Sequence, residues 1–61
     1  MNDTIDGVTF EQAIEVHQLY REDFLSVPQI ASIIGIGHKM VLEILVGRRF
    51  PGAAKHWERK A

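Results

Sequence analysis

Two glycines one residue apart, Gly35 and Gly37, interrupt an isoleucine-rich stretch in the middle of this 61-residue chain. Glycine readily adopts the left-handed backbone conformation that closes a helix, and it is tolerated at the start of the next helix. The surrounding stretch is too short and too polar at its ends to span a membrane. The sequence therefore predicts two short helices, over about residues 27–34 and 38–46, joined by a sharp turn.

The segment before this stretch has the signature of a helix that begins at a capping box. Thr9 and Gln12 have the spacing at which each side chain can bond the backbone N–H of the other residue. Residues at helical spacing then form one face: Phe10, Ala13, Ile14, His17, Tyr20 and Phe24. We predict a helix over about residues 10–24, with Tyr20 and Phe24 in the core and His17 partly buried.

A second capping box, Ser26 and Gln29, is expected to open the first of the two short helices. Pro28 fits a first helical turn, but proline disfavours the helical conformation in the residue before it. Val27 is therefore an alternative cap. The residues expected to be buried in the two short helices are Ile30, Ile33, Ile34, Val41, Ile44 and Leu45.

The two ends of the chain carry weaker signals. Residues 1–8 contain the turn signal Asp6-Gly7 and few apolar positions, which predicts a flexible arm. Residues 51–61 predict a basic tail or a short fourth helix, in which Trp57 packs back onto the core. The predicted fold class is all-α, with a three-helix domain over residues 9–50.

The formal net charge of −1 conceals an uneven distribution. Residues 1–30 contain six acidic residues and one basic residue, whereas residues 31–61 contain two acidic and six basic residues. Such a chain can present a basic face although its overall charge is near zero. The chain has no cysteine, and its three histidines are too far apart for a local ligand pair, so we predict neither a metal nor a cofactor. The acidic N-terminus is unlike a signal peptide and favours the cytoplasm.

Five residues of the central stretch have a recognisable spacing, A-x₃-G-I-x₄-V-x₂-I, formed by Ala31, Gly35, Ile36, Val41 and Ile44. This spacing resembles the helix-turn-helix of DNA-binding proteins, in which a small residue and a glycine turn let two helices cross closely. The run I-L-V-G-R-R-F that follows is similar to the close of short phage and resolvase-like units. The resemblance implies a small three-helix helix-turn-helix domain.

The resemblance also implies roles for individual residues. The second helix of the pair would enter the major groove of double-stranded DNA, which makes His38, Lys39, Leu42 and Glu43 candidates for contact with base edges. The candidates for phosphate contact are Ser26, Gln29, Arg48, Arg49, Lys55, Arg59 and Lys60. The chain departs from the family at two places. Gly37 stands where a serine is common, and the outer side of the predicted helix over residues 38–46 carries the apolar residues Leu42 and Val46, where polar residues are common.

The apolar outer residues leave three interpretations open. Leu42 and Val46 can face DNA, can be covered by the tail through Phe50 or Trp57, or can contact another protein or subunit. In the third case, the candidate protein interface consists of Leu42, Val46, Phe50 and Trp57.

The resulting function hypothesis is a small DNA-binding protein that acts as a homodimeric regulator of transcription in a phage or mobile element. The alternative is a protein-interaction module or small inhibitor on the same fold. No nucleophile with a matching base and no phosphate-binding loop stands in the sequence, so we predict that the chain is not an enzyme.

Overall fold

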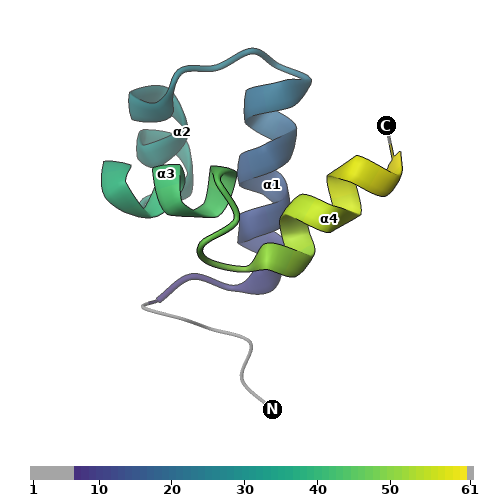
Figure 1. The fold of residues 1–61 in the computed structure, drawn as a ribbon. Coiled ribbons are helices and arrows are strands. Elements are labelled where there is room, and N and C mark those ends of the chain that lie inside the picture. Colours follow the sequence, from purple (N-terminus) through teal and green to yellow (C-terminus); the bar gives the residue numbers. More distant parts are fainter. Residues whose placement is uncertain (1–6, 61) are drawn as a thin grey trace.

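The computed structural model describes residues 7–60, with side chains up to Trp57. It contains four helices: α1 (Phe10–Arg21), α2 (Val27–Ile34), α3 (His38–Leu45) and α4 (Pro51–Lys60) (Figure 1). Helix α1 packs against the other three helices, and α3 also packs against α2 and α4. The all-α prediction is confirmed, and the segment left open as a tail or a helix is a helix.

Both predicted capping boxes are present. The Thr9 hydroxyl accepts from the Gln12 N–H at 3.1 Å, and the Gln12 side chain accepts from the Thr9 N–H at 3.0 Å. Ser26 and Gln29 repeat the arrangement at the start of α2, with distances of 3.3 and 2.9 Å. Ser26 is therefore the N-cap in preference to Val27. Each cap contributes about 1 kcal/mol to a helix that is otherwise short.

The turn between α2 and α3 has the predicted construction. Gly35 lies in the left-handed region, with φ of 86°, and its N–H donates to the carbonyl of Ala31 at 2.8 Å. The Ile36 N–H donates to the same carbonyl at 3.1 Å. Gly37 then returns to extended backbone as the N-cap of α3. A residue with a side chain would be strained at Gly35, so the glycine fixes where α2 ends.

The end of α1 differs from the prediction. The helix stops at Arg21 and not at residue 24, and Phe24 takes the left-handed position that a glycine commonly fills after a helix, with φ of 56°. The Leu25 N–H reaches back to the carbonyl of Leu19 at 3.1 Å. The prediction that Tyr20 and Phe24 are core residues is wrong: Phe24 lies beyond the end of α1, and Tyr20 lies within α1 but is not covered by the rest of the fold. Both side chains are exposed.

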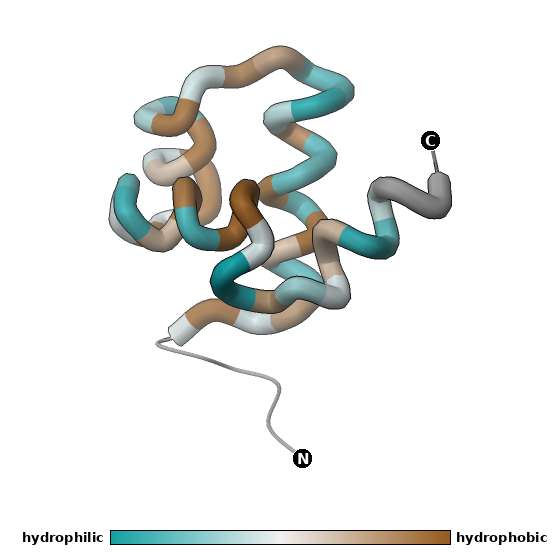
Figure 2. The backbone as a smooth tube through the Cα atoms, in the orientation of Figure 1, coloured by the Kyte–Doolittle hydropathy of each residue, from teal (hydrophilic) through white to brown (hydrophobic). Residues whose placement is uncertain are grey.

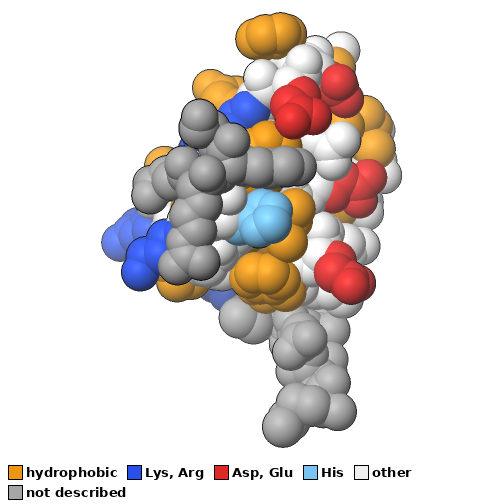
Figure 3. All heavy atoms as spheres, turned by 90° about the vertical axis from the view of Figure 1, so that its right-hand side faces the viewer, with side chains coloured by type: hydrophobic (Ala, Val, Ile, Leu, Met, Phe, Trp, Pro, Cys, Tyr) orange, Lys and Arg blue, Asp and Glu red, His pale blue; other side chains and the backbone are white. Residues whose placement is uncertain are grey.

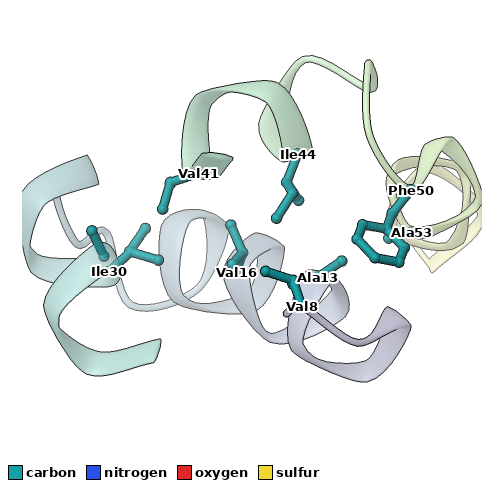
Figure 4. Packing of buried hydrophobic residues seen from close by; sticks show 9 residues of the cluster. Val8, Ala13, Val16, Ile30, Val41, Ile44, Phe50 and Ala53 are labelled. Atoms are coloured by element: carbon teal, nitrogen blue, oxygen red, sulfur yellow. The ribbon is translucent and has the colours of Figure 1, made fainter. Parts of the chain in front are cut away.

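The core lies where α1 meets the other helices, and Figure 4 shows side chains from all parts of the chain pointing into it. Its buried apolar members are Val8, Ala13, Val16, Ile30, Ala31, Val41, Ile44, Phe50 and Ala53. Val8 is fully buried, so the predicted flexible arm over residues 1–8 is wrong at its last residue. Residues 1–6 lie outside the described part of the chain. Ile33 is exposed, against the prediction that it belongs to the buried face of α2.

Helix α4 packs against α1, and the prediction that Trp57 packs back onto the core is confirmed. The indole N–H of Trp57 donates to the carbonyl of Ile14 at 3.2 Å. The rings of Phe10 and Phe50 meet edge to face with their centroids 6.2 Å apart. Gly52 faces the Phe10 ring so closely that an added Cβ would lie 3.3 Å from it. The core therefore extends beyond residue 50, and the proposed boundary between domain and tail does not divide the packing.

Candidate nucleic-acid interface

The outer face of α3 is open to solvent. Val41 and Ile44 point inward and are fully buried, whereas Leu42 is 50% exposed and Val46 is 68% exposed. His38 and Lys39 are exposed in the first turn of the same helix. The interpretation in which the C-terminal segment covers Leu42 and Val46 is therefore wrong.

Phe50 and Trp57 have a different role from the one predicted for them. Only 7% of Phe50 and 6% of Trp57 are exposed, and both pack within the core. Neither residue can anchor another protein while the fold is intact. Of the predicted protein interface, only Leu42 and Val46 remain accessible.

Glu43 and Arg49 form an ion pair beside this face, with 2.6 Å between the Arg49 Nε and a Glu43 carboxylate oxygen. The hydrogen bond from Arg49 is the main reason that the pKa of Glu43 is lowered, and the positive charges of Arg49, Lys39 and Arg48 lower it further. The carboxylate therefore stays ionised and is held by Arg49. This arrangement argues against the predicted contact of Glu43 with a base edge, and it engages the Arg49 side chain in the ion pair.

The backbone after α3 explains how this pair forms. Gly47 is left-handed, with φ of 84°, and the chain folds back so that the N–H groups of Arg48 and Arg49 donate to the carbonyl of Glu43 at 2.9 and 3.2 Å. The Arg48 side chain is exposed. A hollow of about 370 Å³ lies beside it, lined by Glu43, Arg48, Arg49, Phe50 and Pro51. Sequence spacing did not reveal the Glu43–Arg49 pair, because six residues across a glycine do not correspond to a helical contact.

The other phosphate candidates fall into three groups. The Ser26 and Gln29 side chains bond each other and the opposite backbone N–H groups, so their observed role is capping. Lys55 is exposed on α4. Arg59 and Lys60 lie beyond the described side chains. The described cations that flank the outer face of α3 with an exposed side chain are thus Lys39 and Arg48.

The acidic side chains occupy a different sector of the molecule. Four of them are exposed on α1 or directly after it, at Glu11, Glu15, Glu22 and Asp23. Helix α3 covers another side of α1, so the outer face of α3 points away from the acidic sector. Figure 3 shows the acidic side chains mainly toward one edge of the molecule and basic side chains mainly toward the opposite edge, although a basic side chain also lies beside the acidic ones near the top. The charge asymmetry of the sequence is therefore also a spatial separation.

Within the described residues, no three potential metal ligands come together. None of the four described helices has the length and hydrophobicity needed to cross a bilayer. No protein-family model, curated protein or solved structure matches the chain.

Proposed function

We propose that this chain is a small DNA-binding protein in which α2, the Gly35 turn and α3 act as a helix-turn-helix. The observation that supports this proposal best is the open outer face of α3, which has a lysine in its first turn and an exposed arginine just past its end. The acidic residues of α1 lie in another sector, so they do not oppose the approach of phosphates to this face.

The residues of this face have distinct roles in the proposal. His38 and Lys39 in the first turn of α3 reach base edges in the major groove. Leu42 and Val46 contact thymine methyl groups. Arg48 binds a backbone phosphate, which positions α3 without reading sequence. The Glu43–Arg49 ion pair holds the turn after α3 in place.

The proposed biological role is occupancy of a promoter or an attachment-type site by a regulator of a phage or mobile element. A single short recognition helix gives little affinity. Two copies on paired half-sites are the usual remedy, so the proposal includes a homodimer.

The alternative function is docking on another protein through Leu42 and Val46. It is favoured by the large exposed fraction of these two apolar side chains, since an exposed apolar surface commonly marks an interaction site. Under this alternative, the cations flanking α3 would orient the partner and would not contact DNA.

The proposal is tested by binding to a mixed-sequence duplex, measured by fluorescence anisotropy, with the variants Lys39→Ala and Arg48→Ala. Each variant should weaken binding and reduce the steepness of the salt dependence by about one phosphate contact. Gln18→Glu is the matched control, because it changes the net charge equally but lies exposed on α1. If all three variants bind alike, the effect is one of total charge and α3 is not the contact surface.

A second pair of substitutions separates DNA contact from protein docking. Leu42→Ser with Val46→Ser removes the exposed apolar side chains and leaves the cations. On the DNA proposal, it should change the preference among duplex sequences while the salt dependence stays the same. Unchanged sequence preference and affinity would favour the docking alternative.

A further inference from the structure

The connection between α1 and α2 exposes an aromatic side chain on a strained backbone. Phe24 is 86% exposed, and its φ of 56° lies in the left-handed region that residues with large side chains rarely adopt. Nothing in the described fold covers the ring and offsets this strain by burial. Residues in such conformations cluster at binding and switch sites.

A hollow lies beside this aromatic ring. It has a volume of about 420 Å³ and is lined by Tyr20, Arg21, Phe24 and Leu25. Its walls are mainly apolar, and Tyr20 is half exposed. Figure 2 shows the connection changing from hydrophilic at the end of α1 to hydrophobic before α2. The corner therefore combines a projecting apolar group with an apolar depression.

Charges of both signs border the same corner. Arg21, Glu22 and Asp23 are consecutive and exposed. Figure 3 shows hydrophobic side chains at the top of the molecule, with acidic and basic side chains below them. A twofold axis brings one surface patch against its own copy, so a patch that contains both a projection and a depression, and both signs of charge, is complementary to itself.

We propose that this corner, defined by residues 20–25, is a contact surface between two copies of the chain. Phe24 of each copy lies over the hollow between Tyr20 and Leu25 of the other. Arg21 of each copy faces the acidic pair Glu22 and Asp23 of the other. The pairing buries the two exposed phenylalanine rings, and the opposite charges fix its orientation.

The arrangement is compatible with the proposed DNA contact, and this consequence rests on the proposed function. In Figure 1 the α1–α2 connection arches over one end of the molecule, while α3 lies below it. The outer faces of both α3 helices therefore stay accessible in the pair.

The test is sedimentation equilibrium of the full chain over a range of concentrations, without DNA. The wild type should show a concentration-dependent monomer–dimer equilibrium. Phe24→Asn should shift it toward monomer by at least roughly tenfold in the dissociation constant, while circular dichroism shows an unchanged fold, since asparagine tolerates left-handed backbone. Ile33→Ser, at an exposed apolar residue of α2 that has no proposed binding role, is the control and should leave the equilibrium unchanged. A wild type that stays monomeric throughout, or a Phe24→Asn variant that pairs like the wild type, would overturn the proposal.

A charge exchange tests the orientation. Arg21→Glu alone should weaken self-association, because the new carboxylates face Glu22 and Asp23. Mixing it with a Glu22→Arg, Asp23→Arg variant should restore pairing between the two different chains. Equal self-association of all these chains would overturn the orientation. Because these measurements contain no DNA, their failure would remove the pairing through residues 20–25 and leave the proposed contact of α3 with DNA untouched. Failure of DNA binding would leave the pairing intact.

Discussion

The two phenylalanines with left-handed backbone show how differently one strained conformation can be maintained. Phe50 has φ of 51° and Phe24 has φ of 56°, and such a conformation costs on the order of 1–3 kcal/mol for a residue with a side chain. Phe50 is 7% exposed, whereas Phe24 is 86% exposed. The φ angle is thus nearly the same at the two corners, whereas one ring is buried and the other is exposed to solvent.

The α3–α4 corner offsets its strain within the chain. The Phe50 ring lies edge to face against Phe10, and its carbonyl accepts from the Ala53 N–H at 2.9 Å in the first turn of α4. The α1–α2 corner has a backbone hydrogen bond from Leu25 but no burial of the Phe24 ring. We infer that packing within the chain stabilises the left-handed backbone of Phe50, and that the exposed ring of Phe24 contacts another copy of the chain.

The largest expected effect is at the buried corner. Phe50→Ala removes a buried ring and leaves a cavity between α1 and α4, so the free energy of unfolding should fall by about 3–5 kcal/mol. In a domain of this size, that is enough to unfold most of the protein. Urea denaturation followed by circular dichroism measures it. A loss below about 1 kcal/mol would show that the Phe50 contacts do not hold this corner together.

A smaller loss is expected where α4 is anchored to α1. Trp57→Phe keeps an aromatic ring but removes the indole N–H that donates to the Ile14 carbonyl. Loss of this hydrogen bond should lower the free energy of unfolding by about 1 kcal/mol. Lys55→Ala, an exposed change on the same helix, is the control and should have little effect. Equal stability of wild type and Trp57→Phe would mean that apolar packing alone anchors α4.

A pH-dependent loss of stability is expected on the buried side, from His17. This residue is fully buried on α1, and neither ring nitrogen has a hydrogen-bond partner among the described groups. Burial lowers the pKa of His17, the charge of Arg21 lowers it further, and the backbone of Ile44 opposes this in part. The unfolded chain, with a histidine pKa of 6.5, therefore binds the proton first. The contribution of neutral His17 to the free energy of unfolding is therefore complete above pH 6.5. It is lost as the pH falls from there toward the lower pKa of the folded state.

Denaturation midpoints measured on either side of this pH test the prediction. The wild type should be less stable on the acidic side, and His17→Leu should reduce the difference, because a leucine cannot take up a proton. An unchanged pH dependence in His17→Leu would assign the effect to other groups.

The smallest expected effect is at the exposed corner, where two contributions of opposite sign nearly cancel. Phe24→Gly relieves the left-handed strain without removing buried contacts, but it also gives the unfolded chain more freedom. The stability of the monomer should therefore change by no more than about 1 kcal/mol, measured by denaturation at low protein concentration. A loss as large as that of Phe50→Ala would show that the Phe24 ring supports the folded monomer, which its exposure argues against.

Local signals in the sequence predicted most of the fold. Capping at Thr9 and Ser26 and the glycine at Gly35 act within a few residues, so their effects can be read from spacing alone. The end of α1 could not be predicted, because Phe24 replaces the glycine that usually marks such an end. In the sequence, apolar residues at helical spacing continue past Arg21. The prediction therefore placed the Phe24 ring in the core.

The candidate site was less predictable than the fold. The exposure of Lys39 and Leu42 follows from their position on α3 opposite Val41 and Ile44. The ion pair between Glu43 and Arg49 depends on the backward turn at Gly47 and has no counterpart in sequence spacing. The burial of Phe50 likewise depends on where α4 docks, which is a long-range contact.

The most direct test of the central claim, that α3 and its flanking cations bind DNA, is the binding of the wild-type chain to a mixed-sequence duplex at two salt concentrations. We expect weak binding that falls steeply with added salt, with a log–log slope of about −2 or steeper, because Lys39 and Arg48 would each neutralise a phosphate. Absence of binding at low salt, or binding that does not respond to salt, would contradict it.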